Sequence, residues 1–283
     1  MELKIGEYFF SWDRPVVMGI LNLTPDSFYD GGRHNDIKEV LSHCEKMINE
    51  GADIIDLGAF STRPGMQIIS AEEETERLLP SLIAIKNNFP KAIISIDTFR
   101  KNVAMNAIEN GADIINDISG GTFDEEMLPW IGKNHIPYIM MHSGDSLERL
   151  HSDVIENDVC IELKSFFKKQ TGKLSEYGGA SVILDPGIGF NKSIKDNFKL
   201  LKNIEEYRIN GLPVLIGISR KSMIYKTLKT TPQESLNGTT RISLFWLGLP
   251  AAASPRSPPV FLPNMRTLKS WSATPPTILP QWK

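Results

Sequence analysis

Cysteine is scarce in this chain, and long apolar runs are missing. Cys44 and Cys160 are its only cysteines, which leaves no disulfide framework and no cysteine-based zinc site. No stretch approaches the ~18 consecutive apolar residues of a membrane-spanning helix. The first 15 residues also lack the apolar core of a secretory signal. The sequence therefore predicts a cytoplasmic protein.

A strong net charge is absent too. Lys and Arg number 31 against 34 Asp and Glu, a formal charge of -3 that gives no reason to expect nucleic acid or a membrane surface as partner. The composition, 41% hydrophobic and 23% charged, is ordinary for a globular protein. A chain of 283 residues can bury a substantial core.

What the chain does contain is an alternation of short aliphatic runs and helical patterns. The runs are rich in Ile and Val, as in parallel strands that are buried on both faces. They cover residues 16–21, 53–58, 92–97, 113–118, 137–142, 181–186 and 213–218. Helical patterns between them cover residues 36–51, 70–88, 100–111, 155–170 and 193–207, with Asp36 and Ser70 as caps.

This alternation predicts an α/β fold, a barrel of the TIM (β/α)8 type. Seven strand candidates leave the barrel one unit short, so the eighth strand-helix unit is expected to be missing or replaced. An open doubly wound sheet is the rival, but no G-x-G-x-x-G motif follows the first strand. In a barrel of this kind, functional residues gather at the carboxyl ends of the strands.

Each predicted strand has an apolar body and a polar end. A single polar end commonly caps a turn, but seven in register predict one shared site. Carboxylates such as Asp97 and Asp185 accept from ring N–H groups, Asn116 donates and accepts, and Lys221 binds a ring carbonyl or an anion. This set suits a flat, nitrogen-rich heterocycle such as a pterin or a purine.

The loops after the strands add two further binding features. Thr62 and Arg63 suit a phosphate or diphosphate, and Phe28 and Phe190 suit an aromatic co-substrate. Purely structural roles also stay open: Phe190 as packing for its loop, His142 as a satisfied strand end, and Asp56 as a support for the second loop.

Six motifs stand in order along the chain: "GILNLTPDSFYDGG", "IIDLGAFSTRPG", "SIDTFR", "IINDISGG", "ILDPGIGF" and "LIGISRKSMI". Together they resemble the signatures of the dihydropteroate synthase family, over about residues 16–240. The resemblance implies a TIM barrel that condenses 4-aminobenzoate with 6-hydroxymethyl-7,8-dihydropterin diphosphate. The products would be 7,8-dihydropteroate and pyrophosphate, in folate biosynthesis, with Mg²⁺ as the cofactor.

The resemblance also implies residue roles. Asp97, Asp185 and Lys221 would be catalytic, and Asn22 would lie near the metal and the diphosphate. The aminobenzoate site would be the one that sulfonamides resemble. The substrate-binding set would be Asn22, Phe28, Thr62, Arg63, Pro64, Asp97, Asn116, Asp185, Phe190, Gly217, Lys221 and Ser222. The resemblance also implies a homodimer, formed in the family through C-terminal helices, which are the part that is altered in this chain.

Residues 241–283 depart from the family pattern. They hold eight of the 18 prolines and three of the five tryptophans, and they contain no acidic residue. They also lack the Arg-x-His that ends the eighth strand in the family and that, by the resemblance, belongs to its diphosphate site. The open readings are a natural proline-rich tail and a reading-frame shift near Thr240; the apolar content favours the frame shift. We therefore expect a barrel domain over 1–240 and an aberrant, poorly ordered tail over 241–283.

Two consequences follow from that tail. A barrel with seven strands would present two open edges and fail to close, unless "ISLFWLGL" covers the gap. Turnover would be weak, because part of the diphosphate charge would go unmet. The alternatives to an active synthase are a corrinoid-linked methyltetrahydrofolate methyltransferase and an inactive barrel damaged at its C-terminus.

Overall fold

The computed structural model describes most of the first 246 residues. The described ranges are 3–5, 8–10, 15–23, 33–59, 68–144, 146–147, 150, 155, 157–219, 221–228, 231 and 242–246. The chain divides into two compact units, Met1–Gly248 and Leu249–Lys283, and every described residue lies in the first. The expected boundary after residue 240 lies outside these ranges, as does the predicted tail apart from 242–246.

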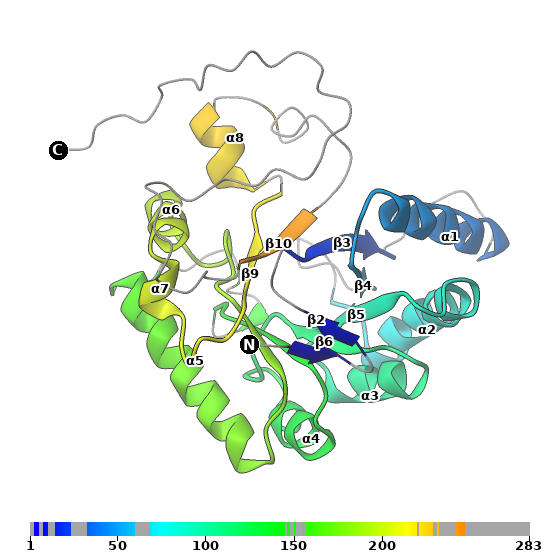
Figure 1. Cartoon of the computed structure of the whole chain (residues 1–283), viewed down its shortest axis with the longest axis horizontal. Coiled ribbons are helices and arrows are strands. Elements are labelled where there is room, and N and C mark those ends of the chain that lie inside the picture. Colours follow the sequence, from blue (N-terminus) through cyan, green and yellow to red (C-terminus); the bar gives the residue numbers. More distant parts are fainter. Residues whose placement is uncertain are drawn as a thin grey trace. The chain divides into compact units, whose positions relative to one another are not determined.

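Eight strands form a closed barrel (Figure 1). In order around the barrel they are β10 (Ile242–Trp246), β3 (Val17–Asn22), β4 (Ile54–Gly58), β5 (Ile93–Asp97), β6 (Ile114–Asp117), β7 (Tyr138–Met141), β8 (Val182–Asp185) and β9 (Val214–Gly217). Neighbours from β3 to β9 are parallel, as the sequence predicts. The fold is therefore the TIM-type barrel and not the doubly wound sheet.

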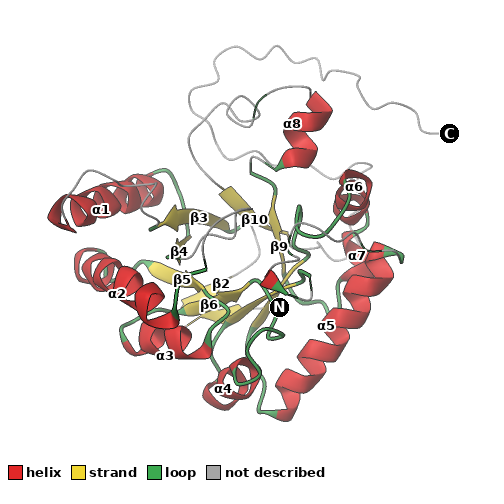
Figure 2. Cartoon of the chain, turned by 180° about the vertical axis from the view of Figure 1, so that it is seen from behind, coloured by secondary structure: helices red, strands yellow, loops and turns green. Residues whose placement is uncertain are grey.

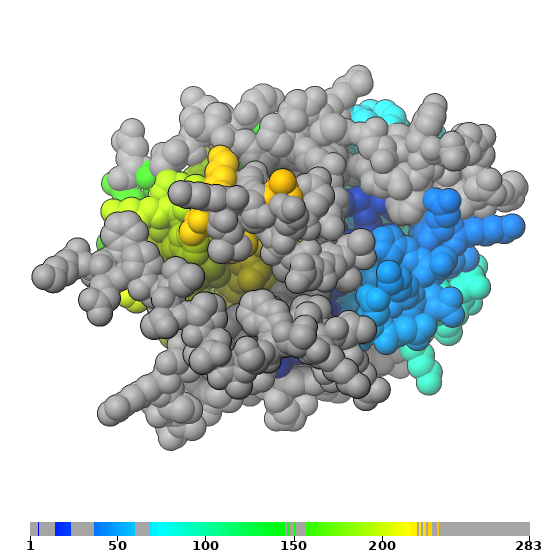
Figure 3. Space-filling view, turned by 90° about the horizontal axis from the view of Figure 1, so that it is seen from above, coloured from blue at the N-terminus to red at the C-terminus, as the bar shows by residue number. Residues whose placement is uncertain are grey.

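Helices connect the parallel strands and surround the barrel (Figure 2). They are α1 (Arg33–Asn49), α2 (Ala71–Asn88), α3 (Lys101–Glu109), α4 (Met127–Asn134), α5 (Val159–Glu176), α6 (Ile194–Lys202), α7 (Ile204–Tyr207) and α8 (Ser222–Leu228). Ser70 caps α2 as predicted, but α1 begins before its predicted cap, Asp36. Figure 3 shows the blue surface of α1 and the yellow-green surface near α6 on opposite sides of one face.

Two apolar clusters lie on the two faces of the barrel sheet. The outer cluster joins strand residues such as Leu57, Ile96 and Leu184 to the helices. The inner cluster consists of residues at or near the strand starts and Ile5: Val16, Met18, Ile54, Ile93, Ile114, Ile139, Ile183, Leu215 and Ile5. Successive strand residues face opposite sides, so this inner set fills the amino end of the barrel.

A short hairpin at the N-terminus contributes to that inner cluster. β1 (Leu3–Ile5) pairs antiparallel with β2 (Tyr8–Phe10). Ile5 is completely buried among the barrel's own aliphatic side chains. The amino end of the barrel is thus closed by apolar packing, which leaves the carboxyl end for polar chemistry.

β10 is the one described barrel strand that runs antiparallel to its neighbours. Ile242 pairs with Gly19 of β3, and Ser243 pairs with Gly217 of β9. The predicted replacement of the eighth unit is confirmed: residues 242–246, the first part of "ISLFWLGL", form a strand that covers the gap between β9 and β3, so the barrel closes. An antiparallel strand satisfies the backbone groups of both edges and needs no helical crossover.

No helix in the part of the chain that the structure describes has the length and apolarity to cross a membrane.

Candidate active site

The barrel interior changes from aliphatic to polar between one inward-facing position of the strands and the next, two residues later. Two residues beyond the aliphatic layer, the inward positions include Asp56, Ser95, Asn116 and Asp185. Two residues further, β3, β4 and β5 end in Asn22, Gly58 and Asp97. Because strand side chains alternate, these groups share the interior face at the carboxyl end of the barrel.

Gly58 leaves an opening between two polar side chains at this end. A Cβ added at Gly58 would lie 3.4 Å from Asp97 Oδ2 and 3.7 Å from Asn22 Oδ1. Asn22 and Gly58 are also paired across β3 and β4. Both oxygens therefore border a space that any larger residue at position 58 would fill.

Asp56 and Asn116 form a partly buried hydrogen bond below this opening. The Asn116 Nδ2 group donates to Asp56 Oδ2 at 3.1 Å, and only 3% of Asp56 is exposed. Burial raises the pKa of Asp56 to about 6, although Ser95 and Asn116 partly oppose the shift. Asp56 thus supports Asn116, whereas the sequence left it as a support for the second loop.

Asp185 organises the loop that follows β8. Its Oδ1 accepts a hydrogen bond from the backbone N–H of Gly187 at 2.7 Å. Gly187 has a φ of 63°, and a Cβ there would lie 2.1 Å from the carbonyl oxygen of His142. Only glycine fits this turn, which explains the second residue after Asp185 in "DPGIGF".

Phe190, at the end of the same turn, meets Lys221. The Lys221 Nζ atom lies 4.2 Å from the centre of the Phe190 ring. A Cβ at Gly189 would lie 3.0 Å from Lys221 Cδ, so the lysine side chain passes close over the loop backbone. Phe190 therefore does more than pack its loop, because its ring faces a cation at the site.

Lys192 is a site residue that the sequence reasoning missed. Its Nζ lies 3.2, 3.3 and 3.1 Å from the carbonyl oxygens of His142, Gly187 and Phe190, and 3.1 Å from His142 Nδ1. These contacts tie the turn after β8 to the end of β7. A single lysine after a glycine-rich motif gives no periodic signal, so only the tertiary structure identifies it.

His142 has the structural role that the sequence left open. Burial, together with the nearby Lys192 charge, lowers the pKa of His142 well below its ordinary value, so the ring is neutral at pH 7. A neutral ring can accept from Lys192 through Nδ1. The ring also packs edge-on against Phe166, with 4.9 Å between centroids.

Arg100, in the segment between β5 and α3, contacts both α2 and the residues that precede it. Arg100 pairs with Glu74, which is 1% exposed, and its Nη2 donates to the carbonyl oxygen of Ile69 at 2.7 Å. Residue 69 follows the segment that carries Thr62, Arg63 and Pro64. Arg100 lies three residues after Asp97, so its contact joins residue 69 to the segment that follows β5.

The carboxylates and cations at the site are strongly desolvated. Burial, assisted by Asp56, Glu74, Asp117 and Asp185, raises the pKa of Asp97 well above its ordinary value. Burial also raises the pKa of Asp185 to about 6 and lowers the pKa of Lys221 to about 8. These groups have lost hydrogen bonds to water through burial. A ligand that donates N–H groups to the carboxylates and accepts from the lysine would replace those hydrogen bonds.

The structure brings several of the predicted site residues to the carboxyl end of the barrel. Asn22, Asp97, Asn116 and Asp185 come from strand ends, Gly217 ends β9, and Phe190 and Lys221 lie in the loops that follow. Ser222 begins α8, but its side chain lies outside the described part. Phe28, Thr62, Arg63 and Pro64 lie outside the described residues altogether.

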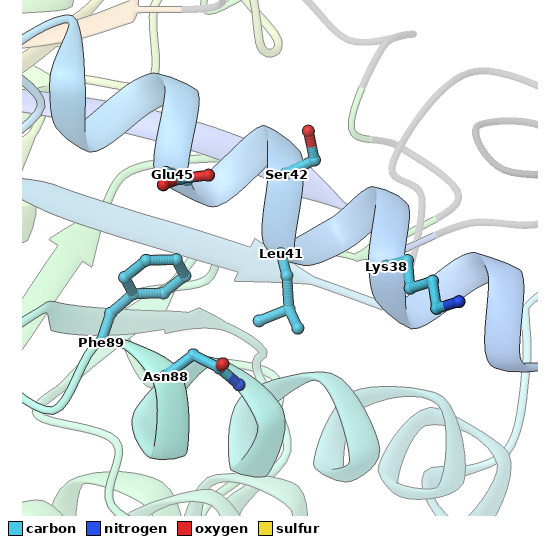
Figure 4. Close-up of a pocket in the computed structure, with 6 residues that line it drawn as sticks. All are labelled: Lys38, Leu41, Ser42, Glu45, Asn88 and Phe89. Atoms are coloured by element: carbon cyan, nitrogen blue, oxygen red, sulfur yellow. The ribbon is translucent and has the colours of Figure 1, made fainter.

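A groove of about 390 Å³ lies elsewhere, between α1 and the end of α2 (Figure 4). It is lined by Lys38, Leu41, Ser42, Glu45, Asn88 and Phe89. None of these comes from the carboxyl end of a strand, so the groove is separate from the candidate active site.

Comparison with known proteins identifies the family. A model described as pterin binding enzyme matches residues 18–247. The dihydropteroate synthase of Clostridium beijerinckii is 44% identical to this chain, covering 84% of the chain and 86% of the relative. This chain belongs to the dihydropteroate synthase family. The synthase of Synechocystis sp. is 41% identical, covering 84% of the chain and 83% of the relative.

Solved structures of the synthase family agree with this assignment. The Yersinia pestis dihydropteroate synthase in a sulfonamide drug complex has a TM-score of 0.76 and 35% identity, covering 83% of this chain and 86% of that one. The Xanthomonas albilineans synthase with 4-aminobenzoic acid has a TM-score of 0.75 and 32% identity, covering 83% and 84%. Family membership makes the chain a transferase of folate biosynthesis and decides against the corrinoid-linked methyltransferase.

Proposed function

We propose that this chain binds 6-hydroxymethyl-7,8-dihydropterin diphosphate at the polar end of its barrel and joins it to 4-aminobenzoate. The observation that carries the proposal is the convergence of four groups from separate strands or their loops: Asp97, Asn116, Asp185 and Lys221. They lie at the barrel end that TIM-type enzymes use for catalysis. Dihydropteroate synthase relatives support the choice of substrates.

Recognition of the pterin follows from the donor and acceptor chemistry of these side chains. Asp97 and Asp185 accept from the ring N–H and amino groups, and Lys221 donates to the ring carbonyl. The buried carboxylates exchange costly desolvation for charge-assisted hydrogen bonds when the ring binds. Phe190 forms one wall beside Lys221 and supports the aromatic co-substrate.

The reaction then requires one bond to break and one to form. The C–O bond between the pterin methylene and the diphosphate breaks, and its electron pair leaves with pyrophosphate. The resulting cation is conjugated with the pterin ring, where the carboxylates of Asp97 and Asp185 stabilise it. The amine nitrogen of 4-aminobenzoate attacks the methylene, and its proton passes to the departing pyrophosphate or to solvent. In this proposal the site is completed by five residues whose side chains the structure does not describe: Phe28, Thr62, Arg63, Pro64 and Ser222.

The residues at the site fit magnesium only if the substrate supplies part of its ligands. Asn22 Oδ1 offers the amide oxygen that Mg²⁺ accepts, and it borders the space beside Gly58. The described residues contain no group of three or more His, Cys, Asp or Glu arranged around a metal. Substrate phosphates would therefore supply further ligands, and magnesium, when bound, would offset the charge on the diphosphate. The homodimer stays a prediction.

A turnover assay tests this function. The purified full chain is incubated with both substrates and Mg²⁺, and dihydropteroate and pyrophosphate are measured together. Asp185→Asn should reduce turnover at least ~100-fold, the scale of one lost electrostatic contact to the transition state. The matched control is Asp53→Asn, whose carboxylate accepts from the Val17 backbone N–H at the opposite end of the barrel. Equal turnover of Asp185→Asn and Asp53→Asn would contradict the residue assignment.

A further inference from the structure

Asp56 lies in the barrel interior on β4, one inward position before the strand end, and contacts Asn116 of β6, two strands away. Its Oδ2 accepts from Asn116 Nδ2 at 3.1 Å. Asn116 is in turn paired with Asp97 across β5 and β6. Asp56 therefore touches a proposed pterin-binding residue, although it is not itself in the proposed binding set.

This contact decides how the side-chain amide of Asn116 is turned. An ionised carboxylate can only accept hydrogen bonds, so the amide must present its NH2 group to Asp56. Its Oδ1 is then directed to the other side, where the described residues give it no hydrogen-bond partner. Asp97 and Asp185 offer acceptors at the same end of the barrel.

We propose that Asp56 is a positioning residue that holds the amide oxygen of Asn116 toward the pterin, so that the site accepts a ring N–H at this point. The inference rests on the proposed function and adds a specificity determinant to it. A ligand with a bare ring nitrogen at this position would face a lone pair and lose affinity. Without Asp56, Asn116 could turn either its amide oxygen or its NH2 group toward the pterin.

Exchanging the two residues tests this role. In Asp56→Asn two amides face each other and neither orientation is enforced, so affinity for 6-hydroxymethyl-7,8-dihydropterin should fall about tenfold, the scale of one hydrogen bond. In the double variant Asp56→Asn/Asn116→Asp, the new amide donates to the new carboxylate, whose second oxygen still faces the ligand. Its affinity should return to within about threefold of the original.

A ligand-free measurement tests the same pair independently. Asn116→Asp alone places two buried carboxylates together, so its melting temperature should fall below that of the double variant at pH 7.5. Asp53→Asn should lower the melting temperature without changing pterin affinity, because its contact lies at the other end of the barrel.

The two readouts separate the possible failures. Loss of pterin binding by the unaltered full chain would overturn the proposed function, and the melting temperatures would still decide the pairing. Unchanged pterin affinity in Asp56→Asn would overturn the positioning role. A double variant that melts no higher than Asn116→Asp would also overturn it, because the exchange would then have restored no contact.

Discussion

The ammonium group of Lys221 lies over the face of the Phe190 ring, 4.2 Å from its centre. The ring face carries a partial negative charge and attracts a cation that burial has deprived of water. Lys221 follows β9 and Phe190 follows β8, so two neighbouring loops form one surface. That surface joins the proposed pterin and aminobenzoate sites.

Replacing Phe190 by Leu should weaken the arylamine site. In the proposed site the ring supplies both a stacking wall and an attractive face for Lys221, so the KM for 4-aminobenzoate should rise about five- to tenfold. Phe198→Leu is the matched control, because Phe198 is 41% exposed on α6. Steady-state kinetics with both variants would measure the difference, and equal KM values would count against a wall at Phe190.

Asp185→Asn should stabilise the ligand-free protein while it weakens pterin binding. Folding raises the pKa of Asp185 from 3.8 to about 6, so the folded state binds more protons between these values. Stability therefore falls as the pH rises through this window, by roughly 3 kcal/mol for about two pKa units. Asp185→Asn has no group that ionises at this position, so its stability does not fall in this pH window.

Thermal unfolding from pH 4 to pH 8 measures the effect on stability. The melting temperature of Asp185→Asn should approach that of the original below pH 4 and exceed it above pH 6. At pH 7.5 the same variant should bind pterin about 1–3 kcal/mol more weakly in calorimetry, the cost of a lost hydrogen bond to a charged group. A constant difference in melting temperature across the whole range would disprove the linkage.

Lys192→Met should disturb the turn after β8. The change removes the donor shared by three backbone carbonyls and His142 Nδ1, and each buried acceptor left unpaired costs about 1–3 kcal/mol. We expect a lower melting temperature and higher KM values for both substrates. Lys195→Met, at an exposed position on α6, is the control. If the two variants behave alike, Lys192 does not hold the turn.

Restoring the expected C-terminal segment should raise turnover. The family's Arg-x-His is missing from residues 241–283, so the diphosphate lacks two contacts that the resemblance implies. A chain whose tail is rewritten in the alternative frame after codon 240 should turn over at least ~100-fold faster. Dihydropteroate formation by both chains measures this. Equal rates, or the lack of a frame that encodes Arg-x-His, would refute the frame-shift reading.

The sequence predicts the parallel part of this barrel because its signals are local. Ile- and Val-rich runs such as 92–97 and 181–186 coincide with β5 and β8, and polar residues follow each run. Closure by β10 depends on two distant edges, so no local pattern indicates its antiparallel direction. The three-residue strands of the N-terminal hairpin are also too short for a periodic signal.

The residues of the candidate site also divide into those that the sequence predicts and those that only the fold identifies. Asp97, Asn116 and Asp185 end predicted strands, so their shared position follows from the barrel itself. Lys192 and Arg100 act through contacts across the fold, with the carbonyl of His142 and with Glu74. Their partners lie 50 and 26 residues away in the chain, beyond the reach of spacing arguments.

The change from aliphatic to polar inside the barrel makes catalytic activity a reporter of strand register. A slip of one residue in β8 would turn Asp185 toward the helices and point Leu184 into the interior. Such a molecule would keep its secondary structure and much of its apolar burial, yet it would lose a proposed pterin ligand completely. The specific activity of a refolded sample would therefore count the molecules whose strands are correctly aligned, a fraction that circular dichroism would not detect.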